Sequence, residues 1–261
     1  TFGLGLTRYN RVEGLGTGLG VDLSLGQGWR TGAVARMGLG DRRLNGEWRI
    51  ARDAWGSAWE LSTYKRLAVS SDLGDPLSVG ASFAALLYGR DEGFYHRATG
   101  VEVIRRPITG RGFELRAFTE QHRDAPVVTT RSLFGGATDP RMGPNTPVEV
   151  GRFTGLTARW QGSAGLDPRG WRVALDVRGE GAVAHTEVFP PPLGAPVCAA
   201  CVPDPIWPAA TRRYGRVLAD AMVSRGLGPV AVAVNAVAGT SAGRLPAQRA
   251  FFLGGLHSVR G

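Results

Sequence analysis

The chain of 261 residues has a formal net charge of +9 and a mean hydropathy of −0.08. It contains no run of about 18 apolar residues, which excludes helical transmembrane spans, but strands that alternate apolar and polar residues would average to this neutral hydropathy. Apart from Lys65, the Lys and Arg residues are all arginines, and they are dispersed rather than gathered in a basic run. Nucleic acid is therefore not an expected partner.

Ten strands are predicted from the alternation of apolar and polar side chains between turn residues. In residues 171–180, for instance, Trp171, Val173 and Leu175 share one face, and charged residues occupy the other. The predicted strands span 9–23, 28–39, 44–53, 57–68, 94–107, 111–123, 148–162, 169–186, 211–225 and 228–240. Residues 82–88 (SFAALLY) suit either a short helix or a buried strand. The fold is therefore expected to be all-β.

Strand length and loop length favour a membrane barrel, although the alternation by itself fits a soluble β-sandwich equally well. Most of the strands run to ten residues or more, nearer to the roughly 9–11 that a tilted membrane strand needs than to the roughly 5–6 of a typical globular strand. The connections alternate between long ones (69–93, 124–147 and 187–210) and short ones (108–110, 163–168 and 226–227). Outer-membrane barrels show this asymmetry. We therefore predict an antiparallel up-and-down transmembrane β-barrel whose long loops share one side with 241–261.

Five tryptophans fall near predicted strand ends: Trp29, Trp48, Trp59, Trp160 and Trp171. A membrane barrel places aromatic rings at its two interfaces with water, because these rings are apolar at one end and polar at the other. Ordinary core tryptophans are the alternative. We expect an interfacial girdle.

No catalytic constellation is recognisable in the sequence. Ser163 lies in a GSAG segment that lacks the strand–turn–helix context of a nucleophile elbow. Asp176 and His185 lie on one predicted strand, too far apart to pair directly. The glycine-rich stretch 14–20 lacks the spacing of a dinucleotide-binding loop. We therefore expect no enzyme activity, no catalytic residue and no cofactor.

Cys198 and Cys201 are the only cysteines, and they form a CAAC segment surrounded by prolines. One such pair is half of a zinc site, but the sequence contains no second pair and its four histidines are far apart. A thioredoxin-like motif would need a strand followed by a helix. We interpret the two residues as a loop disulfide or as two plain thiols, and we expect no metal site.

Both ends of the chain resemble the bacterial surface antigen superfamily, which contains BamA, TamA and the two-partner-secretion translocators. The segments 245–255 (LPAQRAFFLGG) and 258–261 (SVRG) are similar to the sixth extracellular loop of that superfamily, where a proline, an aromatic residue and a Gly-Gly pair precede a V-R-G tip. The matching residues are Pro246, Gly254, Gly255, Val259, Arg260 and Gly261. Residues 9–15 (YNRVEGL) resemble an early barrel strand of surface-antigen-like proteins.

The resemblance implies a 16-stranded barrel in the Gram-negative outer membrane. Residues 1–261 would be the N-terminal part of that barrel domain, about ten or eleven strands, and would end in the sixth extracellular loop. The implied function is the insertion or translocation of other proteins without a covalent step. The implied partners are outer-membrane lipid, unfolded outer-membrane or secreted proteins, and POTRA modules or accessory proteins. An outer-membrane enzyme or a passive porin that shares only the barrel is the alternative.

The resemblance also implies that the loop folds back into the lumen. Gly254 and Gly255 would allow a sharp turn there, and Val259 and Gly261 would present Arg260 at a narrow tip. In the superfamily this arginine pairs with an acidic residue on a strand that follows the loop. The candidate partners within this chain are the predicted lumen-facing acids Glu120, Asp176, Glu180 and Asp220. A solvated surface arginine is the alternative.

Overall fold

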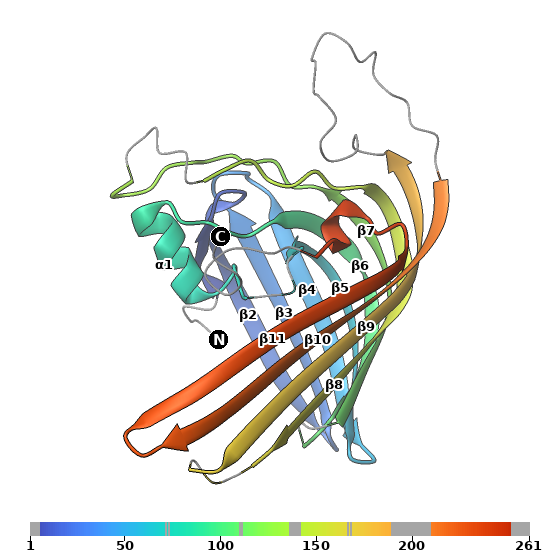
Figure 1. Cartoon of the computed structure of the whole chain (residues 1–261). Helices are drawn as coiled ribbons and strands as arrows, with labels where there is room; N and C mark the ends of the chain where they lie inside the picture. The colour runs from blue at the N-terminus through green and yellow to red at the C-terminus, as the bar shows by residue number, and fades with distance from the viewer. Residues whose placement is uncertain are drawn as a thin grey trace.

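The computed structural model describes residues 6–70, 72, 74–109, 112–135, 142–165, 167, 169–188 and 210–251. These residues form one antiparallel sheet of eleven strands, in which strands adjacent in the chain are neighbours in the sheet (Figure 1). The strands are β1 (Arg8–Asn10), β2 (Gly14–Gly26), β3 (Trp29–Gly38), β4 (Leu44–Ala54), β5 (Ser57–Val69), β6 (Tyr95–Pro107), β7 (Gly112–Asp124), β8 (Val150–Ala164), β9 (Trp171–Val188), β10 (Ala210–Leu227) and β11 (Val230–Gly243). A helix, α1 (Val79–Tyr88), and a 3-10 turn, η2 (Ala247–Arg249), accompany them. The predicted all-β antiparallel meander is confirmed.

The predicted strands correspond to β2–β11, and their ends agree to within three residues except at the start of β2. The strand predicted over 9–23 is wrong there, because the chain turns at residues 11–13 and pairs β1 with β2 as a hairpin. The backbone N–H groups of Val12 and Glu13 donate to Asn10 Oδ1 at 3.0 and 2.8 Å, and Gly14 has a φ of 63°. This asparagine-centred turn with a positive-φ glycine overrides the alternation.

Residues 82–88 belong to α1, so the helical alternative is correct for this segment. Ser78 caps the helix, since its Oγ accepts a hydrogen bond from the backbone N–H of Ala81 at 3.3 Å. Gly89 ends the helix in the left-handed conformation, with a φ of 68°. Among the described residues, no helix is long and apolar enough to cross a membrane.

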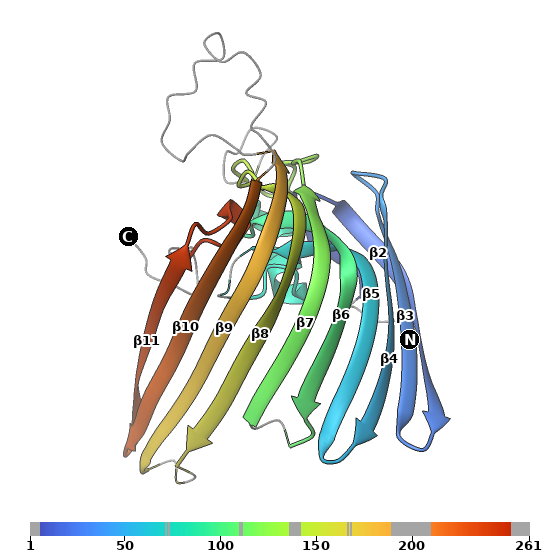
Figure 2. The ribbon, with the colours of Figure 1, turned by 90° about the vertical axis from the view of Figure 1, so that its right-hand side faces the viewer.

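The sheet is strongly curved but does not close on itself (Figures 1 and 2). β1 and β2 lie at one edge and β11 lies at the other. All 14 residues of β11 are exposed, and within the described part of the chain this strand pairs with β10 alone. The closed barrel expected from the sequence is therefore not the architecture observed here, because β11 has no second strand to pair with among these residues. What the structure confirms is the curved, antiparallel up-and-down sheet.

Long and short connections lie at opposite ends of the sheet (Figure 2). Tight links such as 27–28, 55–56 and 228–229 lie at one end, which we call the turn end. The strands β5, β7, β9 and β11 run from this end to the opposite one, which we call the loop end. The strand order therefore agrees with the predicted separation of long from short connections.

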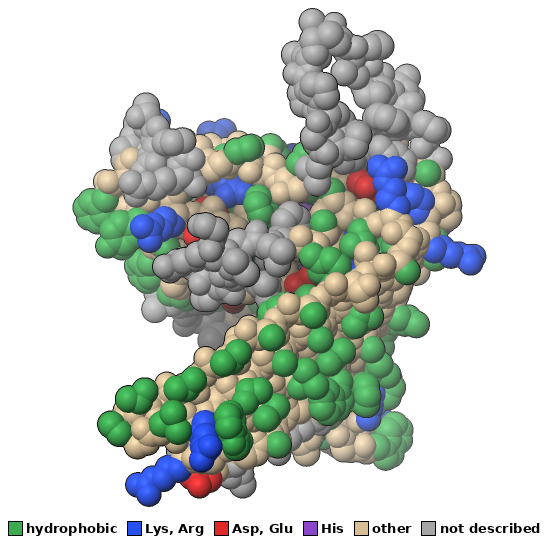
Figure 3. All heavy atoms as spheres, in the orientation of Figure 1, with side chains coloured by type: hydrophobic (Ala, Val, Ile, Leu, Met, Phe, Trp, Pro, Cys, Tyr) green, Lys and Arg blue, Asp and Glu red, His purple; other side chains and the backbone are tan. Residues whose placement is uncertain are grey.

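The two faces of the sheet differ in chemistry. The convex face carries exposed apolar side chains along its whole width, and Figure 3 shows such side chains over β8–β11. They include Leu19, Val21, Trp48, Leu61, Val103, Leu115, Leu156, Val173, Val217 and Val234. The concave face carries charged side chains and the segments that fold over them. A soluble sandwich would instead cover its apolar face with a second sheet, and none of the described residues does so.

The two clusters of buried apolar residues lie toward the loop end, between the sheet, which we call the wall, and the segments that fold over its concave face. One cluster comprises Phe118, Phe153, Ala182, Ala184 and Tyr214, with Leu245 packed against it. The other cluster comprises Val12, Leu67, Tyr95 and Ala125. The core therefore fixes the segments at the loop end and leaves the convex face uncovered.

The tryptophans singled out in the sequence lie on the convex side of the sheet rather than in either core cluster. Trp29, Trp59 and Trp171 are 36%, 44% and 61% exposed, and all three lie close to the turn end. Trp160 is half-buried near the end of β8. Trp48 is 43% exposed but lies near the middle of β4, so the prediction that it marks a strand end is wrong. The core-tryptophan alternative does not describe the exposed rings.

Candidate functional site

The segment that follows β11 turns back onto the concave face of the sheet (Figure 1). Leu245 packs against the core cluster of β7–β10, and Gln248 is completely buried. The ring of Phe251 lies against Gly239 of β11, where an added Cβ would come within 2.8 Å of it. We call residues 244–251 the docked segment.

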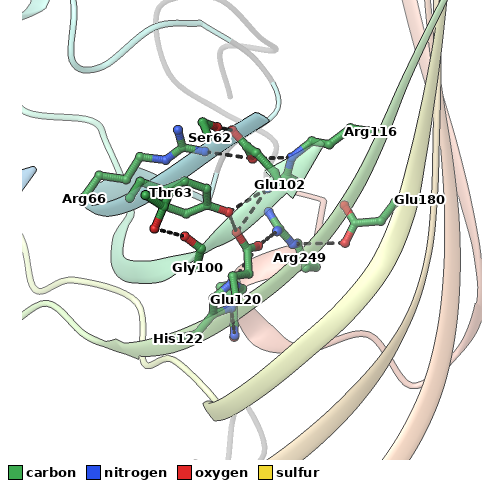
Figure 4. Close-up of polar contacts among 12 residues, drawn as sticks. Ser62, Thr63, Arg66, Gly100, Glu102, Arg116, Glu120, His122, Glu180 and Arg249 are labelled. Carbon is green, nitrogen blue, oxygen red and sulfur yellow. Dashed lines mark hydrogen bonds and ion pairs between the residues drawn. The ribbon is translucent and has the colours of Figure 1, made fainter. Parts of the chain in front are cut away.

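Arg249 joins the docked segment to two acidic residues of the wall (Figure 4). Its Nη2 lies 2.9 Å from Oε1 of Glu120 on β7, and its Nε lies 3.1 Å from Oε1 of Glu180 on β9. The side chains of the two acids are only 3% and 6% exposed. Burial by itself would lower the pKa of Arg249, but the charges of Glu180 and Glu120 outweigh it and raise the pKa. Arg249 is therefore a permanent cation between two buried carboxylates.

The wall supplies further donors to the same carboxylates. The Tyr64 hydroxyl donates to Glu120 Oε2 at 2.5 Å, and Arg116 Nη2 donates to the same oxygen at 3.1 Å. Arg116 Nε also donates to Glu102 Oε2 at 2.6 Å, so one guanidinium bridges two acids (Figure 4). Tyr214 donates to Glu180 Oε1 at 2.6 Å. These donors, together with Arg249, fix the positions of both carboxylates on the wall.

Gln248 anchors the docked segment through three hydrogen bonds. Its Nε2 donates to His122 Nδ1 at 2.9 Å and to the Glu149 carbonyl at 3.0 Å, and its Oε1 accepts from the Glu149 N–H at 3.1 Å. Because His122 Nδ1 accepts, the ring proton sits on Nε2, which donates to Glu120 Oε1 at 2.9 Å. The imidazole also stacks on Phe153, with 4.2 Å between the ring centroids. The histidine therefore serves as a rigid spacer between Gln248 and Glu120.

A second segment, the connection after β5, reaches the same site. Arg216 on β10 donates through Nη1 and Nη2 to the Asp72 carboxylate at 2.5 and 3.0 Å. The same guanidinium donates to the Arg249 carbonyl at 3.3 Å and to Glu180 Oε2 at 3.3 Å. Arg216 thus connects both inserted segments to the wall, across 144 residues of sequence in the case of Asp72.

The early motif YNRVEGL forms a second buried anchor at the loop end. Glu13 is fully buried and accepts from Arg8 at 2.6 and 2.8 Å, from Asn10 at 3.0 Å and from Asn45 at 2.9 Å. Burial would raise the pKa of Glu13, but the hydrogen bonds and charge of Arg8, with Asn10, outweigh it and lower the pKa. Arg11 donates to carbonyls of the connection before β6. The motif therefore ties loops to the wall.

The structure brings two of the four predicted lumen acids together. Glu120 and Glu180 share Arg249, which the sequence reasoning did not single out, although it is the one charged residue between Pro246 and Phe251. The other two lie nearer the turn end: Asp176 pairs with Arg159 and Arg178, and Asp220 accepts from Asn235 at 2.7 Å. The residues Gly254, Gly255, Val259, Arg260, Gly261, Cys198 and Cys201 lie outside the described residues.

Below the docked segment, toward the turn end, a cavity of about 550 Å³ opens on the concave face. Gln161, Asp176, Asp220 and Asn235 contribute its polar lining, and Ser163 also borders it. Among the described residues no histidine lines this cavity, and His185 forms a hydrogen bond with Thr211 on the opposite face of the sheet. The cavity therefore presents charged and polar groups on the concave face.

The comparisons with known proteins do not assign the chain. No protein-family model matches it, no curated protein matches it, and no solved structure matches it.

Proposed function

We propose that this chain forms part of an outer-membrane β-barrel of the surface-antigen type, which helps to insert or translocate other β-rich proteins without a covalent step. The observation that carries this proposal is the distribution of side chains over the sheet: apolar residues are exposed on the convex face, and charged residues are buried on the concave face. Moving one large apolar side chain out of water is worth about 1.5–3 kcal/mol. Lipid around the convex face would supply that stabilisation many times over.

The width of the apolar surface suits a bilayer. On β10, the outward-facing residues between Arg213 and Arg225 are Gly215, Val217, Ala219, Ala221 and Val223. The two arginines are 12 residues apart, which is about 40 Å along a strand and about 28 Å across the membrane for a tilt of about 45°. This value is close to the thickness of a hydrocarbon core, about 30 Å. The exposed tryptophans near the turn end would lie at one interface.

In the proposed barrel, closure would give β11 a second strand with which to pair. This strand carries no charged residue and no proline, the devices that proteins use to protect a free edge. Its outward positions include Val230, Val232 and Val234, all exposed. A long, uncharged edge in lipid would leave a row of unsatisfied backbone groups, so we propose that β11 pairs with a further strand in the complete barrel.

The docked segment supports the mechanistic part of the proposal. Arg249, Gln248 and Arg216 hold it on the wall by non-covalent contacts alone. A segment of this kind occupies the loop end of the lumen and can be released without breaking a covalent bond. Together with the resemblance of 245–261 to the sixth loop of the superfamily, this favours an assembly or translocation role over a permanently open channel.

The test is assisted folding in reconstituted vesicles. The complete barrel domain that contains this chain would be refolded into phospholipid vesicles and recovered by flotation, and the folding of a urea-unfolded outer-membrane barrel would be timed against empty vesicles. We expect faster folding with the wild-type chain and a smaller acceleration with Arg249→Ala. The matched control is Arg213→Ala, an exposed arginine on the convex face.

Three outcomes would contradict parts of this proposal. If the complete domain does not float with the vesicles, it is not a membrane barrel. A chain that floats but does not accelerate folding lacks the assembly role. Steady ion conductance in planar bilayers, equal in the wild type and in Arg249→Ala, would identify a passive channel instead.

A further inference from the structure

A row of alternating tryptophan and arginine crosses the convex face toward the turn end. In the antiparallel registers, Trp29 of β3 lies opposite Arg52 of β4, and Arg52 lies opposite Trp59 of β5. Trp59 in turn lies opposite Arg105 of β6. The Arg52 guanidinium carbon is 5.2 Å from the centroid of the Trp29 ring, within the range of a cation–π contact. The four residues form one continuous strip across four strands.

A second pair of the same kind lies on the other half of the sheet. Arg225 of β10 lies opposite Trp171, the first residue of β9, and its guanidinium carbon is 5.3 Å from the ring centroid. Trp171 is 61% exposed, and Arg225 is exposed as well. Figure 3 shows basic side chains at the turn ends of the front strands. The combination therefore recurs near the turn end on both halves of the sheet.

The arginines of the two faces differ in their partners. On the concave face, arginines of the wall pair with carboxylates: Arg116 with Glu102 at 2.6 Å and Arg159 with Asp176 at 2.5 Å are examples. Arg52, Arg105 and Arg225 have no carboxylate partner among the residues that the structure describes. The Arg52 and Arg225 guanidinium groups lie over the rings of Trp29 and Trp171, and Arg105 Nη1 donates to the Phe113 carbonyl at 3.4 Å. No carboxylate of the described residues therefore competes with an external anion for these three guanidinium groups.

We propose that this Trp–Arg belt, defined as Trp29, Arg52, Trp59, Arg105, Trp171 and Arg225, binds the phosphate groups of anionic phospholipids in the leaflet on the turn side. A guanidinium offers a planar fork that matches two phosphate oxygens, and an indole ring prefers the headgroup level of a bilayer. The indole ring also holds the neighbouring guanidinium at the headgroup level through the cation–π contact. The inference rests on the proposed membrane insertion and adds a lipid class and a leaflet to it.

The experiment measures lipid preference by fluorescence quenching. Wild type, the belt variant R52Q/R105Q/R225Q and the control variant R123Q/R152Q/R213Q would be refolded into phosphatidylcholine vesicles. The control removes three exposed convex-face arginines at the loop end. Each sample would contain a brominated lipid at the same mole fraction, either phosphatidylglycerol or phosphatidylcholine. Quenching of tryptophan fluorescence reports the lipid beside the convex-face tryptophans, which include Trp29, Trp59 and Trp171 of the belt.

We expect wild type and the control variant to prefer brominated phosphatidylglycerol, and the belt variant to lose at least about fivefold of that preference, the effect of one basic residue at an anionic surface. Added sodium chloride should weaken the preference, because salt screens exposed charges. Inorganic phosphate at constant ionic strength should leave the quenching unchanged, since the belt takes the phosphate of a lipid.

Three results would overturn the inference. Equal quenching of wild type by the two lipids would show no preference, and an unchanged preference in the belt variant would place the site elsewhere. Displacement of the lipid by inorganic phosphate would assign the arginines to a soluble anion. Flotation of the complete barrel separates this test from the proposed function: a barrel that does not float contradicts both proposals, and one that floats without a preference contradicts only this one.

Discussion

Replacing Arg249 by alanine removes the cation that two buried carboxylates share. Removing one partner of a buried ion pair costs about 3–5 kcal/mol, because an uncompensated charge remains in the interior. Glu120 keeps Arg116 at 3.1 Å and Glu180 keeps Arg216 at 3.3 Å, so both acids retain one cation. We therefore expect a cost near the lower end, about 3 kcal/mol, which is a shift of about 150-fold in the equilibrium between docked and released segment.

Hydrogen exchange of the docked segment measures this shift. In the docked state, the N–H groups of Arg249 and Ala250 donate to the carbonyls of Pro246 and Ala247 at 2.8 and 3.2 Å. Exchange of a protected amide follows the free energy of local opening. Mass spectrometry of peptides covering 244–251, in refolded protein, should show exchange about 150-fold faster in Arg249→Ala, with the strands of the wall unchanged.

Two variants control this measurement. Arg249→Lys keeps the charge but lacks the planar fork that reaches two carboxylates, so it should restore only part of the protection. Arg213→Ala removes an exposed arginine of β10 and should leave the exchange of 244–251 as in the wild type. Unchanged exchange in Arg249→Ala would refute the reasoning, because the ion pairs would then contribute nothing to docking. The same acceleration in Arg213→Ala would show that net charge, rather than these contacts, sets the protection.

Two further predictions concern the anchors at the loop end. Because the pKa of Glu13 is lowered in the folded protein, its pairing with Arg8 stabilises the fold at pH values above the ordinary glutamate pKa of 4.5, and this stabilisation is lost as the pH falls through the lower folded-state pKa. Glu13→Gln should lower the free energy of unfolding by about 3 kcal/mol at pH 7 and flatten the acid dependence of thermal unfolding, followed by circular dichroism. An unchanged acid dependence would contradict this role. Gly239→Val would place a branched side chain within 3 Å of the Phe251 ring and should accelerate hydrogen exchange of 244–251. Gly179→Val is the control, because a Cβ added at that position meets nothing within 4 Å, and it should leave this exchange unchanged. Equal exchange in the two variants would show that Phe251 does not hold the segment.

Much of this fold is local in origin. Side chains alternate across a strand with a period of two, so the boundaries of β3–β11 follow from the spacing of apolar residues and the positions of glycine and proline. The exception at the start of β2 is also local, because Asn10 satisfies two backbone N–H groups and Gly14 adopts a positive φ. Turn chemistry of this kind is present in the sequence, but it competes with an alternation that continues through it.

The alternation determined, by itself, that most strands have an apolar face and a polar or charged face, and the order of the connections determined which ends of the strands lie together. The alternation did not determine which face of the sheet is enclosed, because a period of two separates the two faces without showing which one lies on the inside. Only the curvature of the assembled sheet places Glu120 and Glu180 on the concave side, within reach of one guanidinium. Arg249 and Glu120 are 129 residues apart, and no local pattern encodes a contact that depends on the path of the four strands between them, β8–β11. The ion pairs of the docked segment are therefore a property of the tertiary structure.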